Sequence, residues 1–283
     1  MTLRQRLFGP LTAAAVIAAS ATAALAQPFE TSTSWLQGFD DWISEIGAMK
    51  ATDFQFSLGT GVGLTTDYPG SDRYKAVALP LFQVRYKDKL TVDPLGIRFR
   101  VWRNSCCRAR LVIGLSESRG ADMASPVSRL PDVDRGMNVG FIFEGRIAGP
   151  LAFRFNARQE VAGGHSGMTL SPALGVVLRD KAQTYSVIPE LALTWASSDY
   201  MDSFFSVTPM GAAVSGLRAF NATPGLRDVS LRLTATRKIS EDWMVVGRLQ
   251  GSKLLGDAKR SSITQQTGDS FQGIAGFGFM YTF

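Results

Sequence analysis

The sequence predicts an all-β protein, a transmembrane antiparallel up-and-down β-barrel of about 12 strands with both termini on the same side. Its last segment carries the first observation, because side chains alternate faces along a strand. Within residues 271–283 one face is almost wholly aromatic: Phe277, Phe279, Tyr281 and Phe283. An outer-membrane barrel closes with such a strand, which turns aromatic side chains to lipid. We therefore expect outer-membrane lipid, lipopolysaccharide and the barrel-assembly machinery as its contacts.

Composition is the second observation. The chain has 28 glycines, only 19% charged residues and a mean hydropathy of +0.05. Such values suit a barrel, whose hydrophobic signal is weak in each strand. The formal charge of +6 falls to +4 without Arg4 and Arg6. The remaining cations are scattered through the strands rather than clustered with aromatic residues, so we do not expect nucleic acid as a partner.

A secretory signal is the third observation. Arg4 and Arg6 precede an apolar, alanine-rich run over residues 11–25, and Ala24-Leu25-Ala26 is a small-x-small cleavage site. We expect residues 1–26 to be removed after Ala26 and the mature protein to reach the cell outer membrane. No later stretch has the roughly 18 uninterrupted apolar residues of a membrane helix.

Residues 27–52 have a helical rather than a strand pattern. Apolar side chains recur at helical spacing between Trp35 and Ile46, with Asp40, Asp41 and Glu45 between them. This predicts a short amphipathic helix in a periplasmic N-terminal segment, either at the membrane interface or beneath the barrel.

From residue 53 to 283 the pattern has period two and defines the barrel domain. We expect strands near 53–64, 76–86, 90–102, 110–116, 137–147, 151–161, 168–179, 184–196, 203–215, 227–237, 242–253 and 270–283. The second half of the third strand follows Asp93-Pro94-Leu95-Gly96, which predicts a bulge or kink. This threading places residues 117–135, 162–167 and 197–202 on the periplasmic side.

Charged residues recur on the face opposite the apolar one. An arginine facing lipid at the bilayer midplane costs about 2–4 kcal/mol, so these side chains are expected to face the lumen. An interior filled by ion pairs and a water-filled, anion-preferring pore both fit the excess of arginine. This predicted lumen-facing charged cluster comprises Arg98, Arg100, Arg110, Glu144, Arg146, Arg154, Arg158, Glu160, Arg179, Glu190, Arg232 and Arg248.

Two possible chemical sites are weak. Cys106 and Cys107 are neighbours, which makes a strain-free bridge unexpected, and the single His165 lies too far away in sequence to complete a metal site. His165 and Ser166 are a histidine and a serine within a glycine-rich turn, where a rigid triad is hard to build. The sequence therefore predicts no catalytic residue, no metal, no cofactor and no enzymatic activity.

Five segments follow one another in the barrel region: the turn at 68–72, the Gly-Gly-His-Ser-Gly run at 163–167, the Trp-containing segment 194–201, and the runs 204–226 and 254–262. In this order they resemble the MipA/OmpV family (MltA-interacting protein). Residues 204–208 and Phe220 depart from the family pattern. The resemblance implies a non-catalytic outer-membrane scaffold that links a murein lytic transglycosylase to a penicillin-binding synthase. Other members are described as adhesins, for which loops 216–226 and 254–269 are the candidates here.

Overall fold

The computed structural model describes residues 53–283 except 88, 95, 121–122 and 183. The predicted signal peptide, its cleavage after Ala26 and the amphipathic helix all fall at residues 1–52, outside the described residues. Within the described part of the chain, no helix has both the length and the hydropathy needed to cross a membrane.

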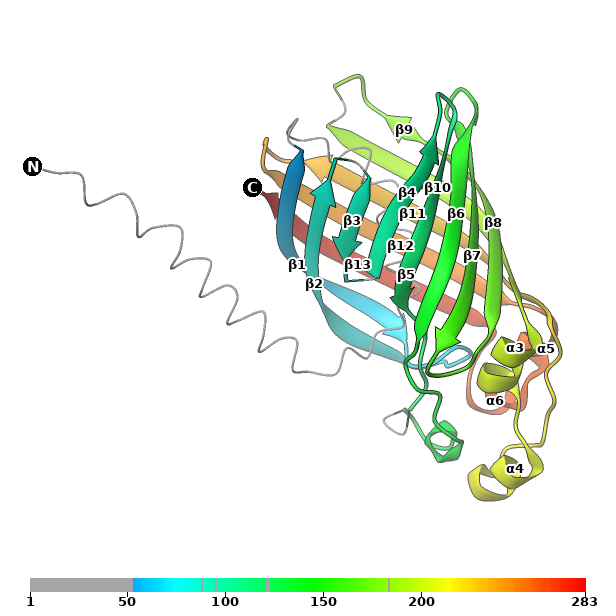
Figure 1. The fold of residues 1–283 in the computed structure, drawn as a ribbon. Helices are drawn as coiled ribbons and strands as arrows, with labels where there is room; N and C mark the ends of the chain where they lie inside the picture. The colour runs from blue at the N-terminus through cyan, green and yellow to red at the C-terminus, as the bar shows by residue number, and fades with distance from the viewer. Residues whose placement is uncertain (1–52, 88, 95, 121–122, 183) are drawn as a thin grey trace, which may run out of the picture. The chain divides into compact units, whose positions relative to one another are not determined.

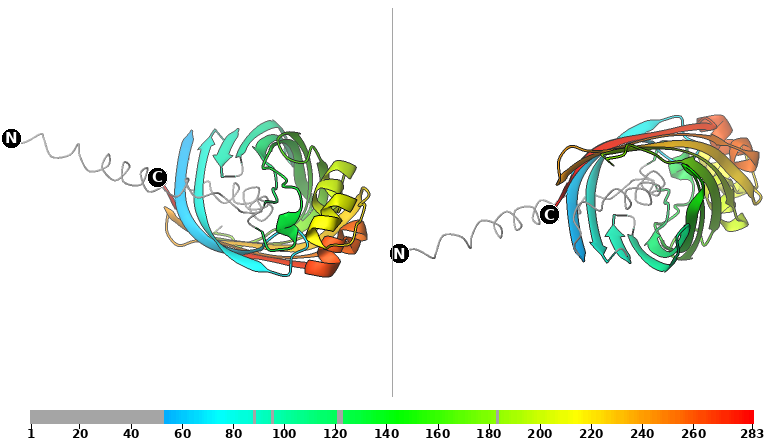
Figure 2. Two further views of the ribbon diagram at one scale, coloured as in Figure 1. Left: turned by 90° about the horizontal axis from the view of Figure 1, so that it is seen from below. Right: turned by 90° about the horizontal axis from the view of Figure 1, so that it is seen from above.

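The described residues form one closed antiparallel sheet (Figures 1 and 2). Consecutive strands pair with each other, including β10 with β11, and β1 pairs with β13 to complete the ring. The short β9 continues β8 along the edge of β10, so the 13 named strands make a 12-stranded barrel. The strands are β1 (Phe54–Thr66), β2 (Tyr74–Tyr86), β3 (Leu90–Asp93), β4 (Gly96–Arg103), β5 (Cys107–Leu115), β6 (Met137–Ala148), β7 (Leu151–Ala162), β8 (Met168–Val176), β9 (Leu178–Arg179), β10 (Tyr185–Ala196), β11 (Gly225–Lys238), β12 (Trp243–Leu254) and β13 (Phe271–Thr282). The predicted fold class is confirmed.

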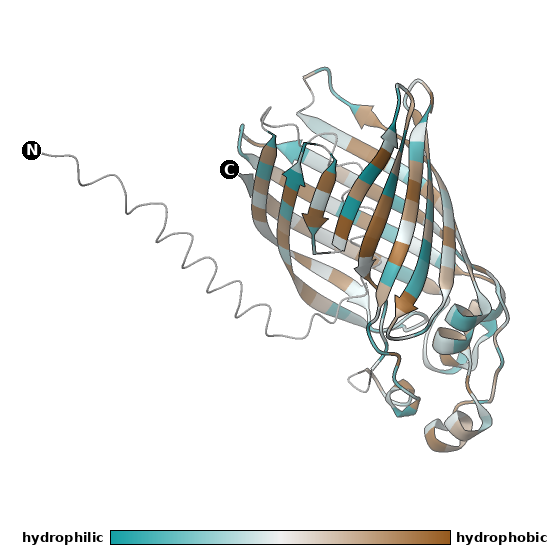
Figure 3. Cartoon of the chain, viewed as in Figure 1, coloured by the Kyte–Doolittle hydropathy of each residue, from teal (hydrophilic) through white to brown (hydrophobic). Residues whose placement is uncertain are grey.

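Side chains alternate between exposed apolar and buried polar positions along the strands, visible as alternating bands in Figure 3. On β5, for example, Leu111 and Ile113 are exposed while Arg110 and Val112 are buried. Phe277, Phe279 and Phe283 of the closing strand are likewise 41–55% exposed. The hydrocarbon core of a membrane stabilises large apolar side chains that are exposed on the outer face of a barrel.

Two strand predictions are wrong and offset each other in the count. Residues 90–102 are not one kinked strand, because Asp93 pairs back with Gly96 and the segment is the hairpin β3–β4. Residues 203–215 are not a strand but lie in the helices α3 (Ser198–Phe205) and α4 (Pro209–Ser215). Proline is favoured at the first position of a helix, and the Thr208 side chain caps α4 by accepting from the Gly211 N–H at 3.0 Å.

All long connections lie at one end of the barrel, which we call the loop end. It carries residues 67–73, 116–136, 163–167, 197–224 and 255–270, including α3, α4, α5 (Gly256–Arg260), α6 (Ser262–Thr267) and the 3-10 turn η2 (Val127–Arg129). The opposite end, which we call the terminus end, carries Phe283 and the short connections 87–89, 104–106, 149–150, 180–184 and 239–242 (Figure 1). The predicted threading put residues 117–135, 162–167 and 197–202 at the same end as both termini, and it is wrong because the structure places them opposite Phe283. Reading β3–β4 as one strand shifted the alternation of ends for all three segments.

The loops at the loop end pack against one another. Tyr68, Leu130, Val207, Leu217 and Ile263, which belong to four different loops, bury each other together with Val127. A second cluster joins α3 to α5 through Phe204, Phe205 and Ala258. The Ser261 hydroxyl donates to the Phe205 carbonyl at 2.6 Å. This end of the barrel is a folded cap rather than a set of separate loops.

Small residues line the inner wall where β1 meets β13. Gly61 lies opposite Gly278 in the register of these strands. A Cβ at position 61 would contact the Phe277 carbonyl oxygen and the Gly278 Cα, the latter at 3.0 Å. The neighbouring inner wall is apolar and contains Leu79, Leu81, Met244, Val246 and Met280. The close approach of β1 and β13 therefore requires a residue without a side chain at position 61.

We expect Gly61→Ala to weaken closure of the barrel, because the added Cβ overpacks a backbone contact at a cost of about 1–3 kcal/mol. The measurement is the urea midpoint of the refolded protein, followed by heat-modifiable gel mobility. Gly247→Ala is the matched control, since its nearest neighbour would be a carbonyl oxygen 3.8 Å away. Equal midpoints for both variants would contradict the close approach at this seam.

Candidate functional site

The barrel interior carries a chain of ion pairs across neighbouring strands, which we call the interior charge network. Glu144 on β6 contacts Arg108 and Arg110 of β5, and its Oε2 lies 3.5 Å from Nε of Arg154 on β7. Arg154 also reaches Glu190 of β10 at 3.2 Å. Antiparallel pairing produces this arrangement, because Glu144 stands opposite Arg154 and Arg108 in the register.

Glu190 joins both halves of the network. Its two carboxylate oxygens lie 3.2 Å from Arg154 and 3.0 Å from Arg232, which stands opposite it on β11. Only 4% of the surface of Glu190 is exposed. A carboxylate removed from water in this way is stabilised only by the opposite charges beside it.

The predicted cluster divides by exposure. Buried members are Arg98, Arg110, Glu144, Arg154, Glu160, Glu190 and Arg248, and partly buried members are Arg100, Arg158, Arg179 and Arg232. Arg146 is exposed, because it lies at the end of β6 next to the terminus end. The functional role of the set stays a prediction.

Sequence reasoning missed several charged residues of the interior, among them Arg85, Asp93 and Arg108. Arg85 is 8% exposed on β2, and its position in the period-two pattern of residues 77–85 could have identified it. Asp93, which contacts Arg98, was read as part of a kink. Arg108 was missed because β5 begins three residues before the predicted strand.

A polar cavity of about 50 Å³ lies where the interior meets the cap. Glu160 organises one wall, since it accepts hydrogen bonds from the Ser116 hydroxyl and from the backbone N–H groups of His165 and Ser166. Arg158 donates to Asn138 at 3.0 Å and to Asn156 at 3.1 Å. A space of this size fits a few water molecules and not a sugar ring. Its lining residues are Ser116, Glu117, Asn138, Asn156, Arg158, Glu160, His165, Gly167, Thr169, Ser171, Thr194, Tyr200 and Arg227.

His165 connects the β7–β8 turn to α3. Its ring packs edge-on against Tyr200 and Phe204, with centroids 5.1 and 5.2 Å apart. Its Nδ1 accepts a hydrogen bond from the Gly167 N–H at 2.9 Å, which requires an unprotonated Nδ1. Burial lowers the pKa of His165, against the opposing effects of Glu160 and Glu117. This turn was predicted at the same end as both termini, and that prediction is wrong, since the turn belongs to the loop end.

The Tyr200 hydroxyl forms a second set of polar contacts beneath the cap. Its hydroxyl donates to Glu117 and accepts from Arg227, so the β5–β6 loop, α3 and β11 meet at one oxygen. Burial raises the pKa of Tyr200 well above its ordinary value. The phenol therefore stays protonated and acts as a fixed hydrogen-bond donor.

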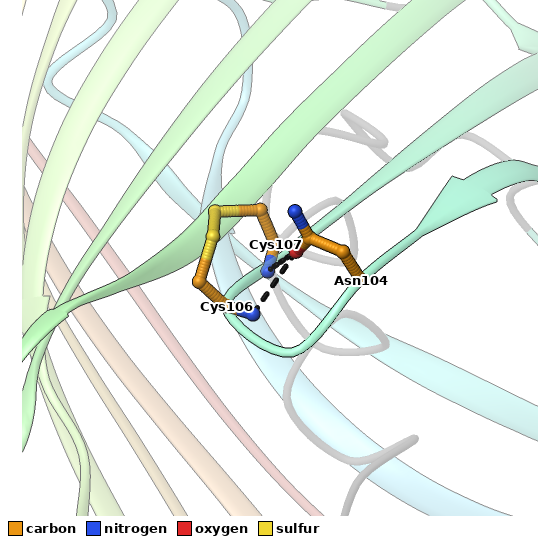
Figure 4. Close-up of a disulfide and its surroundings, with 3 residues drawn as sticks. All are labelled: Asn104, Cys106 and Cys107. Carbon is orange, nitrogen blue, oxygen red and sulfur yellow. Dashed lines mark hydrogen bonds between the residues drawn. A yellow bond between two sulfur atoms is a disulfide. The ribbon is translucent and has the colours of Figure 1, made fainter.

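Cys106 and Cys107 form a disulfide between adjacent residues in the β4–β5 turn (Figure 4). The expectation of two thiols without a bridge is wrong. The Asn104 side-chain oxygen accepts from the N–H groups of Cys106 and Cys107, at 3.0 and 2.8 Å. The turn lies at the terminus end.

An apolar outside, a charged interior, a closed ladder and short turns at one end define an outer-membrane β-barrel. Residues 58–283 match the family described as MltA-interacting protein MipA, and the chain belongs to this family. The expected family resemblance is thereby confirmed.

Solved outer-membrane barrels resemble the chain at low identity. A KdgM porin has a TM-score of 0.39 at 9% identity, over 80% of this chain and 99% of its own. A bacterial polysaccharide outer membrane secretin has a TM-score of 0.44 at 10% identity, over 81% and 98%. The COG4313 outer membrane channel from Pseudomonas putida F1 has a TM-score of 0.36 at 11% identity, over 84% and 98%. No curated protein matches the chain.

We expect Glu190→Ala to destabilise the barrel by about 3–5 kcal/mol, because it leaves the buried Arg154 and the partly buried Arg232 without the carboxylate between them. The free energy of unfolding in lipid vesicles, followed by tryptophan fluorescence, checks this. Glu241→Ala is the control, since Glu241 is exposed at the terminus end. Equal effects of the two substitutions would refute the network.

We expect acid to loosen the cap through His165. Its pKa is lower in the folded protein than the ordinary 6.5, so the unfolded chain binds more protons below that pH. Stability is thus full above pH 6.5 and declines as the pH falls toward the folded pKa. Limited proteolysis of residues 163–167 between pH 7.5 and 5.5, on wild type and His165→Gln, measures this. Identical pH dependence in both proteins would exclude His165 as its source.

Proposed function

We propose that this protein is a non-enzymatic scaffold that holds a murein lytic transglycosylase, together with a penicillin-binding synthase, at the outer membrane through its terminus end. The family description, MltA-interacting protein, carries the proposal. In bacterial barrels short turns face the periplasm and longer loops face outward. On that rule the terminus end faces the compartment that contains murein and the enzymes acting on it.

The terminus end offers a charged surface rather than enlarged loops. Among the described residues there, exposed cations exceed the nearby carboxylates Asp53, Asp180, Glu241 and Asp242. We call this surface the basic rim, defined by Lys87, Lys89, Arg103, Arg146, Lys181 and Arg237. Exposed cations attract an acidic partner surface over about 10 Å at moderate salt. The scaffold therefore needs no periplasmic loop, and residues 117–135 are not its docking surface.

A surface-binding role is the second candidate, because the loop end is a folded cap with apolar side chains on its outer surface. Met210 and Val214 of α4 are 79% and 53% exposed. The adhesin loops expected at 216–226 and 254–269 both belong to this cap. Packed loops present a fixed surface, which lowers the ordering cost of binding.

The third alternative, an anion-preferring pore, receives less support from the interior. Arg110 and Arg154 lie against Glu144 and Glu190, which neutralises much of their positive field. Solvent reaches only 2–7% of the surface of Arg98, Arg110, Arg154 and Arg248. The inner arginines are better explained as members of ion pairs that fill the barrel.

We expect the combined variant Lys87→Glu, Lys89→Glu and Arg146→Glu to lose most of its retention of a murein lytic transglycosylase. Full-length protein immobilised in lipid nanodiscs is the bait, and retention is measured at two salt concentrations. The charge change replaces attraction by repulsion at the basic rim, and higher salt weakens wild-type retention.

The matched control is Arg218→Glu, Lys253→Glu and Lys259→Glu, which makes the same charge change on exposed residues of the loop end. Unchanged heat-modifiable mobility shows that each variant is folded. If the control lost the enzyme and the rim variant kept it, the loop end would be the binding surface and the proposal would fail.

A further inference from the structure

The adjacent cysteines have no evident structural task. In the chain-entropy account, a disulfide stabilises a fold according to the length of the loop that it closes. Cys106 and Cys107 are one residue apart, so their bond removes almost no freedom from the unfolded chain. The stability of the barrel does not explain this bond.

Other contacts already hold the turn in place. Asn104 accepts from both cysteine N–H groups, and the Asn104 N–H donates to the Cys107 carbonyl at 2.9 Å (Figure 4). The Arg146 N–H of β6 donates to the Cys106 carbonyl at 3.0 Å. The main-chain hydrogen bonds do not depend on the sulfur–sulfur bond, so the turn can persist when that bond is broken.

Position and charge make the bond reactive toward an incoming thiolate. Cys106 is exposed and Cys107 is partly exposed. Arg103 is exposed beside the turn, and Arg108 stands opposite it on β5 with its guanidinium paired to Glu144. Positive charge next to a cysteine favours the thiolate form, which is both the attacking and the leaving species in thiol–disulfide exchange.

The adjoining strand leaves space for the sulfur atoms. A Cβ on Gly145 of β6 would lie 2.7 Å from Cys107 Sγ and 2.9 Å from the Cys106 carbonyl oxygen. The glycine thus leaves Cys107 against the barrel wall while Cys106 faces outward. An attacking thiolate reaches Cys106 more readily, and Cys107 is then the leaving group.

We propose that Cys106–Cys107 is a reversible thiol–disulfide exchange site, whose partner is a dithiol protein of the periplasmic exchange class. The partner thiolate attacks Cys106 Sγ, the bond to Cys107 breaks, and Cys107 leaves as a thiolate. The second partner thiol, as thiolate, then attacks its own sulfur in the mixed disulfide and releases Cys106. Two electrons pass to the barrel, the partner becomes a disulfide, and both released thiolates are protonated from water. The reduced pair presents two adjacent thiols.

The full-length protein in lipid nanodiscs, which leave both ends of the barrel accessible, tests the site, with a soluble bacterial thioredoxin-like dithiol protein as the reductant. We expect no maleimide label before reduction, and a label on both cysteines afterwards, with heat-modifiable mobility unchanged. Phenylarsine oxide, which bridges adjacent thiols, should block both labels. The double variant Cys106→Ser and Cys107→Ser gives the background of maleimide labelling. It should have the same urea midpoint of unfolding as wild type.

The variant Asn104→Ala tests whether the turn positions the two cysteines for exchange or whether the disulfide is only exposed. It removes the acceptor of both cysteine N–H groups, so the reduced pair should re-oxidise more slowly than in wild type. Labels that appear only in denaturant, or full labelling without reductant, would overturn the proposal. Retention of the transglycosylase is a separate readout, so failure of this site leaves the scaffold proposal standing. Labelling of intact cells by an impermeant maleimide would refute the periplasmic partner.

Discussion

Backbone hydrogen bonding without water is the constraint on which the rest of this structure depends. In hydrocarbon every N–H and C=O of a spanning strand needs a partner in the protein, and only a closed ladder supplies one to each edge. Here closure occurs between β13 and β1, where the terminal strands meet. The glycine at position 61 follows from this requirement, because the β1–β13 contact leaves no room for a side chain.

Closure then determines where charge can lie. Each strand has one face toward lipid, so the polar face of every strand points toward a confined interior. Carboxylates such as Glu144 and Glu190 become buried there and are compensated by arginines on neighbouring strands. Ion pairs of this kind are weak sources of net stability. These ion pairs instead specify the register of the strands, since a slip of one residue would turn Glu144 outward, away from the arginines beside it.

The sequence predicted the fold because lipid imposes a simple pattern. The outward aromatic residues of β13 and the period-two strands were identifiable without any tertiary information. Residues 203–215 were misread because α4 begins at Pro209 under a cap made by Thr208, while alternating apolar residues suggest a strand. The interior set was recovered in large part, since alternation identifies its face. The role of Asp93 could not be derived, because the sequence of the β3–β4 hairpin turn also fits a kink within one strand. The Cys106–Cys107 disulfide could not be derived, because the spacing of the cysteines does not specify their oxidation state.

The two ends of the barrel differ in what their chain can do. At the loop end, long connections have enough apolar residues to bury one another, so Phe204, Phe205 and Ile263 create a folded surface above the membrane. At the terminus end the connections are too short to form a core of their own. Their side chains therefore form an exposed ring of charge next to the Cys106–Cys107 disulfide, fixed in position by the neighbouring strands. Under the proposed function, a partner at the terminus end meets a rigid ring, and its specificity comes from charge pattern and disulfide exchange rather than from a shaped pocket.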